Sequence, residues 1–227
     1  MNKNIIIESS RSAFVASVLI VVLALGTFLV LEPTVGRSAT DVFLVTQSVT
    51  DETSFVVAAN NVSMSPSLAG LTGGTASGST TVRVRTNNTT GYNMTIVFSS
   101  STAMKRNGGG GEISNYSPTV VGTPDYAFTA EVFSQFAYTV VASTSGDLNL
   151  SFRDNAAACG AGSNNTANTC WLNPSTTAKA IISTSAASLS SGSTSTIAFR
   201  VNIPTNSVPS VAEGTYTATA TLTAINN

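Results

Sequence analysis

The C-terminal part of this chain alternates between apolar and polar side chains with a period of two. The stretch reads GTYTATATLTA over residues 214–224, with threonines on one face and, on the other, Tyr216, Ala218, Ala220 and Leu222. Successive side chains of a strand point to opposite faces, so the pattern predicts a β-strand with one buried face. The same period recurs at residues 80–85, 92–98, 126–132, 136–140, 148–152 and 197–203.

Polar turns separate these runs. Residues 87–91, NNTTG, are typical of a hairpin loop, and residues 145–147 form another turn. The irregular, glycine-rich residues 99–124 favour a long loop within one domain over a linker between two. We therefore expect an all-β fold, an antiparallel β-sandwich that is Ig-like or jelly-roll-like, preceded by one N-terminal hydrophobic helix.

An uncharged apolar stretch occupies residues 12–31, and the cations Lys3 and Arg11 precede it. Cationic residues stay on the cytoplasmic side, so the chain that follows is expected to be exported. The stretch predicts either a signal peptide or an uncleaved anchor that contacts the membrane. The predicted division is residues 1–39 as leader or anchor and residues 40–227 as an extracellular β-sandwich domain.

The route of processing stays open between three alternatives. Small residues at Gly36 and Ser38 fit cleavage by a signal peptidase, and an intact helix would instead anchor the chain. A cut near residues 11–14 would resemble a type IV pilin-like leader, whose helix assembles into a filament core, although the glycine and glutamate usual in that motif are missing.

Composition argues against most catalytic chemistry. The chain contains no histidine, which removes imidazole bases and ligands, and its net charge of −1 with no basic run argues against nucleic-acid binding. The predictions are therefore no enzyme, no cofactor and no metal site. A hydrolase would need two of the scarce carboxylates to converge, for which the candidates are Glu112, Asp125, Glu131 and Asp154.

The chain has two cysteines, Cys159 and Cys170. In an exported protein they predict a disulfide that holds a flexible loop, with a shaped recognition loop as the alternative. Trp171, the single tryptophan, follows directly. If its ring is exposed, it is the candidate contact of a carbohydrate-binding module, whereas burial would weaken that interpretation.

The terminal strand, from Pro209 to Thr223 with its Gly-Thr-Tyr turn, resembles the last strand of fimbrial subunits and spore-coat-U-like secreted β-sandwich proteins. The cysteines here lie in the second half of the domain, whereas fimbrial subunits carry theirs early. The resemblance implies assembly by β-strand addition between subunits. The donor strand it implies comprises Asp41, Val42, Phe43, Leu44 and Val45, within residues 41–47.

The sequence thus favours an exported, non-catalytic cell-surface protein that is a structural or adhesive component of an envelope layer or fibre. The expected partners are further copies of the chain or surface glycans.

Overall fold

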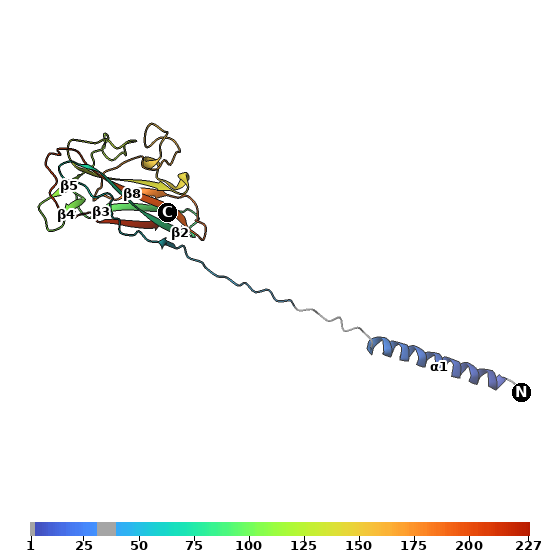
Figure 1. Ribbon diagram of the computed structural model, residues 1–227. Helices are drawn as coiled ribbons and strands as arrows, with labels where there is room; N and C mark the ends of the chain where they lie inside the picture. Colours follow the sequence, from blue (N-terminus) through green and yellow to red (C-terminus); the bar gives the residue numbers. More distant parts are fainter. Residues whose placement is uncertain (1–2, 31–39) are drawn as a thin grey trace. The chain divides into compact units, whose positions relative to one another are not determined.

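The computed structural model describes residues 3–30 and 40–227, which divide into two compact units. The first, Met1–Ser48, contains helix α1 (Lys3–Val30), the N-terminal helix expected from the sequence (Figure 1). No helix in the described ranges is both long and apolar enough to meet the usual requirements of a membrane span. The expected cleavage region, residues 36–39, lies outside the described residues.

The second unit, Val49–Asn227, is called the body here and contains every strand of the described chain. Two single-turn 3₁₀ helices, η1 (Ser145–Asp147) and η2 (Leu150–Phe152), interrupt the strands. The strands are β1 (Thr53–Val57), β2 (Gly74–Thr86), β3 (Tyr92–Phe98), β4 (Met104–Arg106), β5 (Glu112–Asn115), β6 (Gln135–Ala142), β7 (Lys179–Ser183), β8 (Ser193–Ile203), β9 (Tyr216–Thr217) and β10 (Ala220–Asn226).

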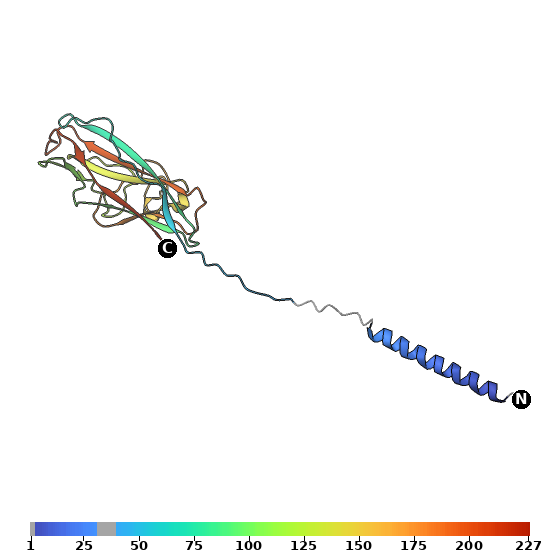
Figure 2. The ribbon, with the colours of Figure 1, turned by 90° about the horizontal axis from the view of Figure 1, so that it is seen from below.

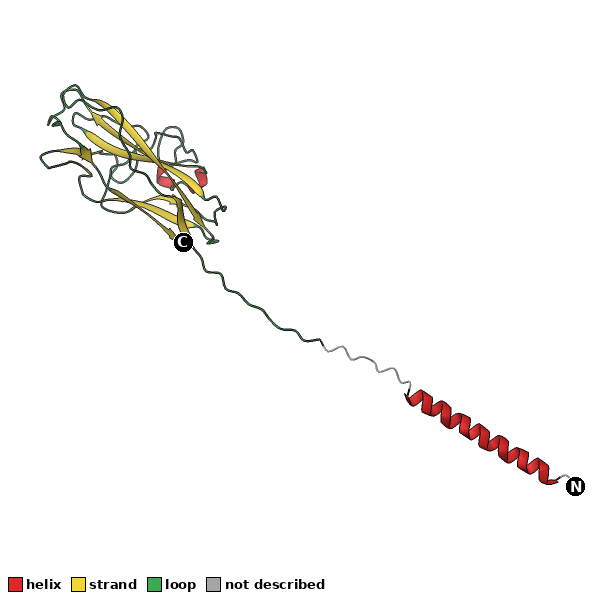
Figure 3. Cartoon of the chain, turned by 60° about the horizontal axis from the view of Figure 1, so that its bottom comes forward, coloured by secondary structure: helices red, strands yellow, loops and turns green. Residues whose placement is uncertain are grey.

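Two sheets make up the body (Figure 2). The larger has seven strands in the order β1-β2-β8-β6-β5-β4-β9, and the smaller has three in the order β10-β3-β7. Neighbours pair antiparallel except for β5 and β6, which pair parallel over two residues. Figure 3 shows the strands of the body in two layers, so the expected all-β, sandwich-like class is confirmed at this level.

One apolar core lies between the two sheets. The larger sheet contributes Val82, Val84, Tyr138 and Ile197, and the smaller contributes Met94, Ile96, Phe98, Ile181 and Ile182, all of them buried. The ring of Phe98 packs against those of Phe136 and Tyr138, with centroids 6.1 and 5.6 Å apart. The alternation seen in the sequence therefore marks the core-facing side of β2, β3, β6 and β8.

Two of the predicted strands are wrong. Residues 148–152 form no strand: Leu148 makes a single β-bridge to Ile182, and Leu150–Phe152 form a 3₁₀ turn in which the side-chain oxygen of Asn149 accepts a hydrogen bond from the backbone N–H of Ser151. Residues 126–132 contain no strand, since Phe128 stacks on the ring of Tyr116 rather than entering a ladder. Alternation alone did not distinguish these segments from strands.

Two predicted connections are also corrected. Residues 87–91 do form a turn, but β2 and β3 belong to different sheets, so the turn is a crossover rather than a hairpin. The terminal run, expected as one strand, is divided: β9 pairs with β4 in the larger sheet and β10 pairs with β3 in the smaller one. The long loop after β3 contains two short strands, β4 and β5, with the glycines between them.

Candidate interaction surface

The predicted disulfide between Cys159 and Cys170 is present. The two Cα atoms lie 5.6 Å apart and close a loop whose ends are 11 residues apart in sequence. Cys170 is buried against the core, whereas Cys159 is half-buried. The disulfide therefore fastens an outer loop to the body, as the structural interpretation of the two cysteines predicted.

Asp154 organises the start of this loop. Its buried carboxylate accepts hydrogen bonds from the backbone N–H groups of Ala156 and Thr166, at 2.8 and 3.2 Å, and from the amide of Asn164 at 3.4 Å. Burial by itself would raise the pKa of Asp154, but the hydrogen bonds to its charged form outweigh it, and the pKa lies below the ordinary 3.8. The charged carboxylate therefore stabilises the folded loop.

Trp171 lies under other side chains rather than at the surface. It is 3% exposed, its indole N–H donates to the carbonyl of Asn168, and its ring meets Phe128 edge-on at 5.9 Å. The guanidinium of Arg200 lies 4.5 Å from the ring centroid of Phe128. A ring covered in this way offers no free face to a sugar, so this placement argues against Trp171 as a ligand contact.

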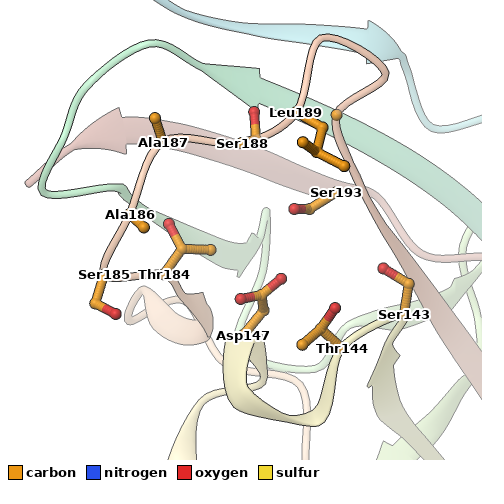
Figure 4. A pocket seen from close by; sticks show the side chains of 11 residues that line it. Ser143, Thr144, Asp147, Thr184, Ser185, Ala186, Ala187, Ser188, Leu189 and Ser193 are labelled. Atoms are coloured by element: carbon orange, nitrogen blue, oxygen red, sulfur yellow. The ribbon is translucent and has the colours of Figure 1, made fainter.

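A small pocket lies beside η1 (Figure 4). Its volume is about 300 Å³, and Asp147 is the only carboxylate among its lining residues. Its hydroxyl groups come from Ser143, Thr144, Thr184, Ser185, Ser188 and Ser193. Burial raises the pKa of Asp147, although a hydrogen bond from Ser193 and the charge of Arg153 oppose the rise. The lining suits a neutral, polyhydroxylated ligand.

The donor segment expected from the sequence is highly exposed. Residues Val42 to Val45 are 80–93% exposed and belong to no strand. Four consecutive large apolar side chains in contact with solvent are unfavourable, since each would gain about 1.5–3 kcal/mol on full burial. This segment is the most exposed apolar stretch between residue 40 and the C-terminus, which makes it a candidate for contact with another surface.

The edge of the smaller sheet at β10 is incompletely covered. Ala220, Leu222 and Ala224 pair with Phe98, Ile96 and Met94 of β3, so each pair shares the core-facing side. The β3 members are buried, whereas Leu222 and Ala224 are half-buried and Ala220 is exposed. In the described part of the chain, no backbone group bonds to β10 from its outer side. The inward side chains of β10 are therefore partly exposed, although the core residues of β3 beside them are buried.

The neighbouring edge of the larger sheet, at β1, shows the same incomplete cover. Phe55 pairs with the buried Val84 and shares its face, yet Phe55 is 37% exposed. The two edges meet at one end, where the hydroxyl of Thr53 donates a hydrogen bond to the side-chain oxygen of Asn226. We call these two edges, Phe55–Val57 and Ala220–Asn226, the β1–β10 flank.

The fimbrial resemblance singled out the donor segment, but sequence reasoning did not predict the β1–β10 flank. The signal available was residue size, because alanine occupies the inward positions 218, 220 and 224, where other strands carry Ile, Phe or Tyr. Small inward residues at a terminal strand leave space that a further strand can fill. The Asp147 pocket was likewise missed, since the sequence marked residues 145–147 only as a turn.

No family model, curated protein or solved structure matches this chain.

Proposed function

We propose that this chain is an exported, non-catalytic cell-surface protein, a structural or adhesive subunit that assembles through β-strand addition. The observation that supports the proposal best is the exposed apolar segment from Val42 to Val45. Extended apolar segments gain stability by adding to the edge of a sheet, where main-chain hydrogen bonds provide affinity and alternate side chains enter the core. Asp41 to Val45 would be the donor strand.

The proposal includes a compartment and a topology. Residues 12–31 carry no charge and follow two cations, which favours export, with the helix either removed or retained as a membrane anchor. The disulfide agrees with an oxidising compartment. We assign the two-sheet body to an Ig-like or jelly-roll-like sandwich, because its long strands pair antiparallel and share one core.

A matched pair of substitutions tests assembly by the donor segment. Val42 and Val121 are 93% and 94% exposed, so Asp replaces the same side chain at the same exposure in both variants. If Val42 is buried on assembly, Val42→Asp should weaken self-association by at least about tenfold, because burying a valine contributes roughly 1.5–3 kcal/mol. Val121→Asp should leave it unchanged.

Sedimentation velocity and electron microscopy of the full chain would measure this effect. A wild-type chain that stays monomeric at all concentrations, or equal effects of the two substitutions, would contradict the proposal. The N-terminal sequence of the protein recovered from cells would separate cleavage near residue 38, retention of the helix, and the type IV pilin-like alternative with a cut near residues 11–14.

A second candidate function is binding of surface glycans, favoured by the hydroxyl-lined pocket at Asp147 rather than by Trp171. Neutral sugars present hydroxyl groups that donate to a carboxylate and accept from serine and threonine. Binding of soluble oligosaccharides, followed by NMR and abolished by Ser188→Leu, would support this function.

A further inference from the structure

We propose that the outer edge of β10 accepts residues 41–47 of a second copy of this chain. The inference rests on the proposed function and adds to it the acceptor strand and the source of the donor. The acceptor is the part of the β1–β10 flank that lies on the smaller sheet, from Ala220 to Asn226.

The edge of β10 has what an added strand requires. Its outward backbone groups have no partner in the described part of the chain, and its inward side chains Leu222 and Ala224 are only half-buried. An eleventh strand would satisfy those backbone groups and place alternate side chains beside Leu222 and Ala224. Phe55, on the facing edge of the larger sheet, would be covered by the same addition.

Donor and acceptor also match in charge. β10 contains no charged residue, and Asp41 is the only charged residue between positions 41 and 49. Pairing the two segments therefore desolvates at most one ion, the carboxylate of Asp41 at the first position of the donor. Val42 and Leu44 lie on one face of an extended segment, and Phe43 and Val45 on the other, so either face can turn toward the core.

Hydrogen bonds at the start of β1 favour a second copy over the chain's own segment. The side chain of Asn87 accepts from the backbone N–H of Glu52 at 2.6 Å and donates to the carbonyl of Thr50 at 3.0 Å. The amide of Asn226 donates to Asp51 at 2.8 Å. A chain that folded back to lay its own residues 41–48 beside β10 would have to reverse at 49–52, and the reversal would break these bonds.

Cysteine cross-linking between two populations of the full chain tests the acceptor. One population carries Thr46→Cys or Gln47→Cys, which cover both faces of the donor. The other carries Thr221→Cys or Thr223→Cys, at exposed threonines of β10. Ser183→Cys is the matched control, because it is exposed at the other edge of the same sheet. The native cysteines are already paired, so the introduced thiols are the free ones.

We expect a mixed disulfide between a donor variant and at least one β10 variant, and none with Ser183→Cys, since a disulfide requires Cα atoms within about 7 Å. Adding Val42→Asp to the donor copy should abolish the mixed disulfide. Far-UV circular dichroism should confirm that each variant is folded.

Three outcomes separate the failures. Assemblies that form without any cross-link to β10, or with equal cross-linking to Ser183→Cys, would overturn the acceptor and leave the proposed function standing. A third variant carries a donor cysteine and a β10 cysteine in one chain. If it forms a disulfide within that chain and the two single-cysteine populations form none between copies, the chain's own segment occupies the edge. A wild-type chain that never associates would overturn the proposed function itself.

Discussion

The two edges of the three-stranded sheet differ in how well they are covered. At β7, Ile181 and Ile182 are fully buried, and the N–H of Asn149 donates to the carbonyl of Ile181 at 2.9 Å. At β10, the corresponding edge has no backbone partner in the described chain and its inward side chains are partly exposed. The same sheet thus ends in one closed edge and one open edge.

The closed edge depends on segments that carry no strand. Leu148, which follows η1, bridges Ile182 of β7, and Phe152 of η2 packs against Tyr138 of β6 with the ring centroids 5.9 Å apart. The loop held by Asp154 and the disulfide continues from there. No comparable segment covers β10 in the described body. In the described body the chain therefore covers one edge itself and leaves the other uncovered, and an uncovered edge is what the proposed strand addition requires.

Replacing a core residue beside the closed edge should have the largest effect. Ile182→Ala should lower the free energy of unfolding by about 2–5 kcal/mol, because a fully buried methyl-rich side chain is replaced by a cavity. Ile225→Ala, the same change at a largely exposed position of β10, should shift it by no more than about 0.5 kcal/mol. Urea denaturation measures both, and equal losses would contradict the full burial of Ile182 beside the closed edge.

Removing the disulfide should have the next largest effect. Cys159→Ser combined with Cys170→Ser should lower the free energy of unfolding by about 3 kcal/mol, the chain-entropy estimate for a loop of this length. Self-association should persist, because the proposed acceptor is the edge at β10 and does not include the loop closed by Cys159 and Cys170. Loss of assembly by a variant that remains folded would place the disulfide loop in the interface.

Truncating a residue of the open edge should cost less stability but impair assembly. Leu222→Ala should lower the free energy of unfolding of the monomer by about 1 kcal/mol, because the side chain is only half-buried. Concentration-dependent sedimentation should show weaker self-association. A stability loss as large as that of Ile182→Ala would mean that β10 is already covered in the monomer.

The smallest expected effect is on the pH dependence of the free energy of unfolding. Asp147 in η1 and Asp154 after η2 should contribute to it with opposite signs. The pKa of Asp154 is lowered, so its stabilisation is present above the ordinary value of 3.8 and is lost as pH falls through the folded value. The pKa of Asp147 is raised, so its contribution is present below 3.8 and is lost as pH rises through the folded value.

Unfolding free energies between about pH 2.5 and 7 would measure these contributions. Asp154→Asn should destabilise the body most near neutral pH, and the difference from wild type should shrink in acid. For Asp147→Asn, stability relative to wild type should instead increase as pH rises. The same pH slope for both variants would contradict the assignment of opposite environments.

Local patterns predicted much of this architecture from particular residues. Alternation identified β2, β3, β6 and β8, and two cysteines in a chain expected to be exported predicted the Cys159–Cys170 bond. These features depend on residues that are close together in the sequence, so they can be predicted from the sequence alone. The segment from Asp41 to Val45 was singled out only through the resemblance to fimbrial subunits, and its role as a donor strand stays a prediction.

Only the tertiary structure decided which surface covers which strand. It placed Trp171 beneath Phe128, turned the loop at residues 87–91 into a crossover, and divided the terminal run between two sheets. The open edge at β10 arose in the same way. The side chains of a strand determine which of its faces points inward. Whether that face is covered depends on segments that are distant in the chain, and a local sequence pattern does not predict which of them pack there.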